Sequence, residues 1–344
     1  MTDRPVPSRT RRLRIVLGGA AALAFVGGSL AGALPAAAAE PTAIVAMGDS
    51  FISGEAAGSY TDRNLCHRSA VAEIAANAIA VDAKLNLACS GAKINDFYAD
   101  GFKGERAQLA QLEEKLESYD VEMVVVSVIA NDVGFASLVT DCATRWVLSA
   151  GACSTAQDRV VTDRLAANEA RLATLLVDID AAMQRGDEDR SYQLVVQTYT
   201  SPINERNRFS SAWRLTFGCP FYEADHRWAY GSVVPQFAGT MARAARAANS
   251  AIGQPRVSVL DLNTAFAGRE VCAPGATVLN EWVRGIDFGD LQQSMHPNSR
   301  GHRAMGACLQ QVYGKPVGEY SCYRASSTTS TLTLRTGLAP ATGV

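Results

Sequence analysis

Residues 123–129 have the sequence MVVVSVI, an almost unbroken run of apolar, mostly β-branched residues. A strand covered by helices on both faces has such a continuous run, whereas a strand with one face in water alternates apolar and polar residues. Similar short runs occur at 42–47, 85–88, 193–199 and 257–262. The stretch therefore predicts a strand in a sheet that is buried on both faces.

Helical patterns separate or follow these strands, at 70–82, 104–117, 158–184, 234–252 and 299–312. An alternation of strands and helices predicts an α/β fold, with a doubly wound parallel sheet in a single domain. Functional residues of such folds lie on loops that follow the carboxyl ends of strands.

Three stretches do not follow this alternation. Residues 200–233, which are rich in aromatic side chains and arginine, and residues 264–295 have no clear period, so we expect surface loops that line a substrate cleft. Residues 325–344 are rich in Ser and Thr and predict a flexible C-terminal tail. The expected folded domain is 40–324.

Residues 1–39 have the features of a signal peptide. Five arginines precede an apolar stretch at 15–34, and Ala37-Ala38-Ala39 is a small-residue cleavage pattern. The alternative is a membrane anchor, but the stretch contains five glycines and is followed by Pro35. Thr10-Arg11-Arg12 leaves open whether export is general or by the twin-arginine route. We expect a secreted protein without stable membrane insertion after cleavage.

The composition excludes several functions. Of 344 residues 48% are hydrophobic and 19% charged, so the chain can bury a core and is not disordered. Beyond residue 39 there are 27 basic and 33 acidic residues, a charge of −6, so nucleic acid is not an expected partner. P-loop and Rossmann signatures are absent, and we expect no cofactor.

All eight cysteines lie beyond residue 39, and none form a CxxC pair. An exported chain is oxidised, so disulfides are expected rather than a metal site. Eight cysteines allow 105 connectivities. Sequential pairing closes short loops and is our working hypothesis: Cys66–Cys89, Cys142–Cys153, Cys219–Cys272 and Cys308–Cys322.

Gly48-Asp49-Ser50 directly follows the first predicted strand, and Gly54 follows a few residues later. A serine at the carboxyl end of a first strand is well placed as a nucleophile. The alternative is a serine that only caps a turn. The sequence lacks the G-x-S-x-G elbow, because Asp49 precedes the serine. Asp49 is interpreted as structural, bonding the turn that holds Ser50.

Four separated blocks of the chain resemble those of the GDSL, or SGNH, hydrolase family. They are Gly48-Asp49-Ser50, Ala88-Cys89-Ser90-Gly91, Ile129-Ala130-Asn131-Asp132 and His296-Pro297-Asn298. The resemblance implies the three-layer, flavodoxin-like fold of that family. It also implies Ser50 as nucleophile, His296 as general base, and an oxyanion hole made by Ser50, Gly91 and Asn131.

Chemistry supports the same base. A serine hydroxyl needs a neutral imidazole within hydrogen-bond reach. The chain has four histidines. His67 lies in an expected disulfide loop, His226 in the aromatic-rich stretch, and His302 inside the last predicted helix. His296 precedes that helix, with Asn298 as a predicted N-cap.

Two departures from the family pattern affect the predicted site. Ala130 replaces a usual glycine. The usual last block is Asp-x-x-His, but Gln293 occupies the acid's position, and Asp287 and Asp290 lie at the wrong spacing. The acid would accept the Nδ1 hydrogen bond of the histidine. A backbone carbonyl in the Gln293–Ser294 turn is favoured for this task, and the alternative is an acid from elsewhere.

The leading hypothesis is a secreted, monomeric serine esterase or lipase that acts on small-molecule or lipid esters through an acyl-enzyme. The resemblance places it with the secreted actinobacterial-type branch that uses a Ser–His dyad. One alternative is a sugar-ester or polysaccharide deacetylase. Another is a non-catalytic binding protein on a decayed hydrolase scaffold.

Overall fold

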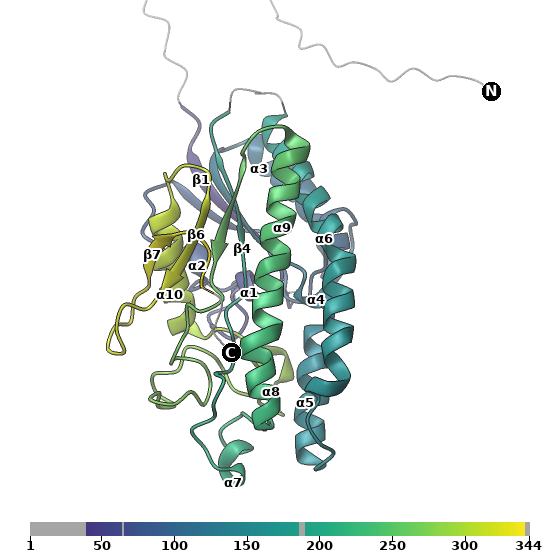
Figure 1. The fold of residues 1–344 in the computed structure, drawn as a ribbon. Coiled ribbons are helices and arrows are strands. Elements are labelled where there is room, and N and C mark those ends of the chain that lie inside the picture. Colours follow the sequence, from purple (N-terminus) through teal and green to yellow (C-terminus); the bar gives the residue numbers. More distant parts are fainter. Residues whose placement is uncertain (1–38, 64, 186–189, 341–344) are drawn as a thin grey trace, which may run out of the picture. The chain divides into compact units, whose positions relative to one another are not determined.

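The computed structural model describes residues 39–63, 65–185 and 190–340. From Glu40 onward the described residues form one unit around a seven-stranded sheet with helices on both faces (Figure 1). The predicted signal peptide lies outside the described residues, apart from Ala39. No helix within these three ranges is long and apolar enough to cross a membrane.

The strand order is β2-β1-β3-β4-β5-β6-β7, parallel except for the pair of β6 and β7. The chain leaves β1 toward β2 on one side and returns to β3 on the other, so β1 and β3 flank a topological switch point. The predicted doubly wound sheet is confirmed. The strand bounds are β1 Thr42–Gly48, β2 Ala83–Asn86, β3 Asp120–Ser127, β4 Gln193–Gln197, β5 Val257–Asp261, β6 Glu319–Tyr323 and β7 Thr333–Thr336.

Helices α3, α6 and α9 cover one face of the sheet, and α2 and α10 cover the other (Figure 1). Shorter helices follow the carboxyl ends of strands or lie in the long connections. The helix bounds are α1 Ser50–Ser53, α2 Glu73–Ala76, α3 Gln108–Leu116, α4 Ala130–Val133, α5 Phe135–Val147, α6 Ser154–Gln184, α7 Ser211–Arg214, α8 Glu223–Trp228, α9 Val234–Ile252 and α10 Ser299–Val312.

Strand β3 explains why the MVVVSVI run is continuous. Val124 and Val126 belong to the apolar core under α6 and α9, whereas Met123 and Val125 belong to the core on the α10 side. All four side chains are 0% exposed. Alternate side chains of a strand point to opposite faces, so both faces here need apolar residues.

The helix predicted over 70–82 is much shorter than expected. It spans only Glu73–Ala76, because the backbone of Asn77 is extended. The Asn77 side-chain amide donates to the carbonyl oxygens of Glu73 and Ile74, and its oxygen accepts from Ile79 N–H. Such local side-chain bonds compete with the helical pattern and end the helix.

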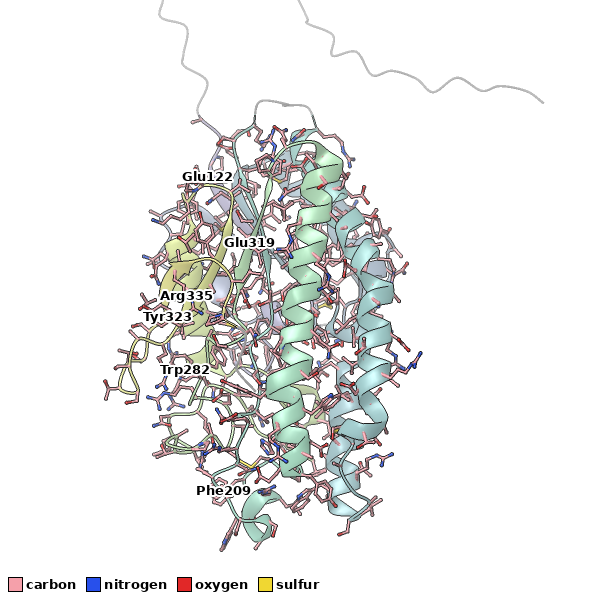
Figure 2. The ribbon with its side chains drawn as sticks, in the orientation of Figure 1. Glu122, Phe209, Trp282, Glu319, Tyr323 and Arg335 are labelled. Carbon is pink, nitrogen blue, oxygen red and sulfur yellow. A yellow bond between two sulfur atoms is a disulfide. The ribbon has the colours of Figure 1, made fainter. Side chains whose placement is uncertain are left out.

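The prediction of a flexible tail over 325–344 is wrong for the part that forms β7. Leu332 is 3% exposed, and Leu334 packs against the same core. Thr333, between these two leucines, is exposed, as expected for a strand with one buried face. Arg335 lies over the ring of Tyr323 on β6, 5.3 Å from its centroid (Figure 2). β7 therefore completes the sheet edge.

Candidate active site

Ser50 lies at the first position of α1, directly after β1. Asp49 caps this helix, because its Oδ1 accepts a hydrogen bond of 3.0 Å from Phe51 N–H. β1 approaches β3 so closely that a Cβ at Gly48 would lie 1.9 Å from the carbonyl oxygen of Ser127. The turn therefore requires glycine at 48, and the structural role predicted for Asp49 is confirmed.

His296 lies against Ser50, although 246 positions separate them in the chain. Its Nε2 is 2.7 Å from Ser50 Oγ, and its Nδ1 is 2.9 Å from the carbonyl oxygen of Ser294. Because a carbonyl only accepts, Nδ1 carries the proton and Nε2 is free to accept the serine proton. Asn298 caps α10 just beyond, as predicted, accepting from Arg300 N–H and Gly301 N–H.

Burial lowers the pKa of His296, although the negative charge of Glu55 and the carbonyls of Ser294 and Gln293 act in the opposite direction. The imidazole is therefore neutral at pH 7, the form that can take a proton from a hydroxyl.

The acids near His296 in sequence are engaged elsewhere. Asp287 accepts from Arg284 at 2.8 Å and from Gly289 N–H at 2.9 Å. The Gln293 side chain bonds to Arg284 and Asp290. Within the described residues, none of these side chains has a hydrogen bond to His296.

The second block is held next to the first. Cys89 N–H donates to the carbonyl oxygen of Gly48 at 3.0 Å, and Ser90 N–H donates to that of Cys66. Gly91 has a φ of +89°, a conformation that favours glycine. In the described part of the chain, the N–H groups of Ser50 and Gly91 have no hydrogen-bond partner. Both are therefore available as donors.

Asn131 comes from the third block, at the carboxyl end of β3. Its side-chain Nδ2 donates to the carbonyl oxygen of Ala92 at 3.0 Å, next to Gly91. Ala130 lies inside α4 without strain, whereas Ile129 before it has a φ of +125°. The left-handed residue is thus Ile129, and such a conformation costs of order 1–3 kcal/mol for a β-branched residue.

Tyr199 is a site residue that sequence reasoning missed. Its hydroxyl donates to Asp49 Oδ2 at 2.6 Å and accepts from Ala130 N–H at 3.1 Å, so it joins the first and third blocks. Burial raises the pKa of Asp49 to about 7, although the hydrogen bonds from Tyr199 and Phe51 lower it. The position of Tyr199 at the end of the strand predicted over 193–199 is a sequence feature that could have indicated a site residue.

The remaining histidines do not contact Ser50. His67 pairs with the buried carboxylate of Glu55 at 2.8 Å. His226 bonds to the carbonyl oxygen of Asn204 at 2.8 Å, and His302 accepts from Glu73 N–H at 3.3 Å. His302 is therefore structural, as predicted.

An apolar pocket opens beside Ser50 and His296. It has about 940 Å³ of empty space, part of it open to solvent. Asp49, Thr200 and Asp225 are among its few polar lining residues. Residues of α5, α8 and α9 contribute part of the wall. The aromatic lining side chains are Phe51, Phe135, Tyr199, Phe221, Trp228 and Phe237.

Four disulfides are present, and they join the predicted pairs: Cys66–Cys89, Cys142–Cys153, Cys219–Cys272 and Cys308–Cys322. The described residues contain no cluster of three or more His, Cys, Asp or Glu side chains that could hold a metal. Cys66–Cys89 fixes the second block, and Cys219–Cys272 joins the two long loops near the site.

A doubly wound sheet that carries a buried serine–imidazole pair beyond its strands is an architecture of carboxylic ester hydrolases, and this chain is one. A family model described as GDSL-like lipase/acylhydrolase matches residues 44–309. The chain belongs to this family, as its four sequence blocks indicated.

Three known proteins resemble this chain in sequence or in fold. The chain is 28% identical over 297 residues to Lipase 1 of Streptomyces coelicolor, covering 85% of this chain and 95% of that protein. An extracellular lipase of Streptomyces rimosus has the same fold, with a TM-score of 0.52, 23% identity, and coverage of 78% of this chain and 99% of that one. Phospholipase A1 of Streptomyces albidoflavus also has this fold, with a TM-score of 0.51 and 21% identity. The match covers 77% of this chain and 95% of that one.

Proposed function

We propose that the protein is a secreted serine esterase or lipase that cleaves acyl esters through an acyl-enzyme on Ser50. The observation that carries this proposal is the hydrogen-bonded series from Ser50 Oγ to His296 to the carbonyl oxygen of Ser294. A nucleophile, a base and a group that orients the base are thereby in line.

In the first half-reaction, Ser50 Oγ attacks the acyl carbon while its proton passes to His296 Nε2. The C–O bond of the ester then breaks, and the departing alcohol takes the proton from the imidazolium. Water repeats the sequence: His296 accepts its proton, its oxygen attacks the acyl carbon, and Ser50 leaves with the proton restored. One ester and one water give one alcohol and one acid.

The negative oxygen of each tetrahedral intermediate needs fixed donors. The N–H groups of Ser50 and Gly91, together with Nδ2 of Asn131, are suited to this task. Fixed donors of this kind do not reorganise when charge develops, which makes each one valuable.

The pocket supports an acyl chain as the group beside the nucleophile. Its wall is formed mainly by aromatic and aliphatic side chains, and a hydrocarbon chain gains free energy in proportion to the apolar area it buries there. An acetyl group would leave most of this space unfilled. The pocket therefore favours esters of longer acids over the acetylated sugars of the alternative hypothesis.

Export is the second part of the proposal. The signal-peptide features of residues 1–39 and the four disulfides support an extracellular enzyme, because disulfides persist in oxidising compartments. We expect the mature chain to act as a monomer without a cofactor.

A fluorophosphonate probe and a series of p-nitrophenyl esters test the proposal. Labelling of Ser50, found by peptide mass spectrometry and abolished in Ser50→Ala, is expected. Val139→Trp narrows the pocket from α5 and should reduce cleavage of long-chain esters much more than that of the acetate. Val147→Trp, on the same helix but half exposed, is the matched control and should leave the profile unchanged. Absence of labelling would refute the acyl-enzyme.

A further inference from the structure

Glu55 is a carboxylate buried beside the candidate site, just after α1. Its side chain is 0% exposed. Ser90 Oγ donates to it at 2.6 Å, and Gln292 Nε2 donates at 3.0 Å. His67 Nδ1 lies 2.8 Å away, and the Tyr60 hydroxyl donates at 3.3 Å. An ionised carboxylate is stable in a buried place only with such partners.

These donors keep the carboxylate ionised. Burial raises the pKa of Glu55, but the hydrogen bonds from Ser90, His67 and Gln292 lower it by more, so the pKa lies below its ordinary value. A full negative charge is therefore held out of water close to the imidazole.

The partners of Glu55 come from the loops that build the site. Ser90 directly precedes Gly91, and Gln292 lies four residues before His296. His67 follows Cys66, whose disulfide fixes Cys89. Gln292 Nε2 also reaches Ser90 Oγ at 3.2 Å. Glu55 thus ties the first, second and last blocks together.

The last block contains no carboxylate that could stabilise a positively charged His296, and the charge of Glu55 can do so. The Ser294 carbonyl fixes the tautomer of His296 but carries only a dipole, whereas a triad aspartate also stabilises the imidazolium with a charge. Charges act strongly over several ångströms in a poorly solvated site.

We propose that Glu55 is a positioning residue that supplies the negative charge missing from the last block, and that it holds the His296 loop against the Gly91 loop. The inference rests on the proposed function, in which His296 becomes positively charged. In agreement with it, the charge of Glu55 acts to raise the pKa of His296 against the effect of burial.

Other titratable groups face the same region. His67 stacks on Tyr60 with ring centroids 4.2 Å apart. Lys103 Nζ donates to the carbonyl oxygen of Ser90 at 2.7 Å. The pKa of His302 is lowered by burial and is also affected by the charges of Glu55 and His296. The ammonium group of Lys103 interacts with the charge of Glu55 and partly offsets it. The test must therefore separate the charge of Glu55 from its hydrogen bonds.

The test is a titration of the four histidine side chains by NMR, together with the pH profile of kcat and KM for a short-chain ester. Glu55→Gln removes the charge but keeps the shape. It should lower the pKa of His296 by roughly one pH unit and lower the plateau kcat about tenfold, with little change in KM. The acid limb of the kcat/KM profile should move to lower pH.

Two variants separate charge from structure. His67→Gln removes the imidazole that contacts Glu55 but keeps the Glu55 carboxylate, so it should not lower the pKa of His296. Glu55→Asp keeps the negative charge and should return the pKa of His296 most of the way to its wild-type value. If Glu55→Gln does not fold, Gln292→Lys on the exposed side of the network places a cation against Glu55 and should lower the pKa of His296, whereas Gln292→Ala should not.

An unchanged pKa of His296 in Glu55→Gln, or in Gln292→Lys where it replaces that variant, would overturn the inference. An equal fall in His67→Gln would also overturn it, because the effect would then come from the contact alone. Each of these results can be obtained with an enzyme whose Ser50 is labelled normally by the fluorophosphonate probe, so they leave the proposed function intact. Failure of the wild-type protein to be labelled would instead refute the proposed function.

Discussion

His296 is oriented by the main chain of Ser294, two residues before it, at 2.9 Å from Nδ1 to the carbonyl oxygen. A carbonyl at this place fixes the tautomer as a carboxylate would, but it cannot be removed by a side-chain substitution. This relationship explains how Gln293 can occupy the position of the family's usual acid: its side chain bonds to Arg284 and Asp290 instead.

Replacing Asp287, Asp290 or Gln293 by Ala should therefore change kcat/KM only slightly. Ser50→Ala and His296→Ala should each lower it by several orders of magnitude, and the double variant should be scarcely worse, because the two residues act as one unit. All variants are measured on one short-chain ester. A loss of about 10³-fold or more at either aspartate would reveal a displaced triad acid.

Asn131→Ala should lower kcat by roughly 10²–10³ with little change in KM, as loss of one oxyanion donor does. Thermal unfolding should be nearly unaffected, because among the described residues the side chain makes a single hydrogen bond, to Ala92. Steady-state kinetics and a melting curve on the same sample check both points. An effect confined to KM would make Asn131 a contact of the bound substrate.

Tyr199→Phe should destabilise the fold by about 1–3 kcal/mol, because it leaves buried partners unsatisfied at Asp49 and Ala130. Denaturant unfolding measures this loss. Tyr192→Phe is a suitable control, since its hydroxyl bonds to Asp180 and Gln184 away from the site. Both variants should lose stability, but only Tyr199→Phe should also lower kcat.

Glu73 should make stability depend on pH. Burial raises its pKa to about 8, although the hydrogen bond from Gln197 lowers it. The folded-state pKa lies above the ordinary value of 4.5, so the protonated side chain stabilises the folded state fully below pH 4.5. This stabilisation is lost as the pH rises toward 8.

Glu73→Gln should consequently raise Tm at about pH 9 by roughly 2 °C or more relative to the wild type, and have little effect near pH 5. The exposed variant Glu117→Gln serves as the control. Part of the pH dependence should remain, because burial also raises the pKa of Asp49 and Glu270 to about 7. A Tm difference that is the same at both pH values would contradict the assignment.

The exported protein should contain no free thiol when it is unfolded and titrated with Ellman's reagent. Peptide mapping without reduction should recover the four pairs found here, including Cys219–Cys272 across 53 positions. Reduction should lower the thermal stability, since a native bridge typically contributes about 2–4 kcal/mol. A different pairing would require the loops at 200–233 and 264–295 to be arranged differently.

The central strands of the sheet and most of the catalytic candidates were predictable from the amino-acid pattern. Strands β1, β3, β4 and β5 could be predicted because burial on both faces leaves continuous apolar runs, whereas β2 at the edge is only partly buried. Ser50 and His296 stand in short motifs that local chemistry explains. β6 and β7 were not predicted. β7 is an edge strand with few buried residues, and β6 lies between β5 and β7 but has the sequence EYSCY, which is not an aliphatic run.

The orientation and the surroundings of His296 depend on how the loops pack in the folded protein. The Tyr199 hydroxyl and the Glu55 carboxylate leave no periodic signal, since they act through contacts with residues far apart in sequence. The Ser294 carbonyl leaves none because it belongs to the main chain. The left-handed conformation of Ile129 is of the same kind: the surrounding packing imposes it against the local preference of the residue.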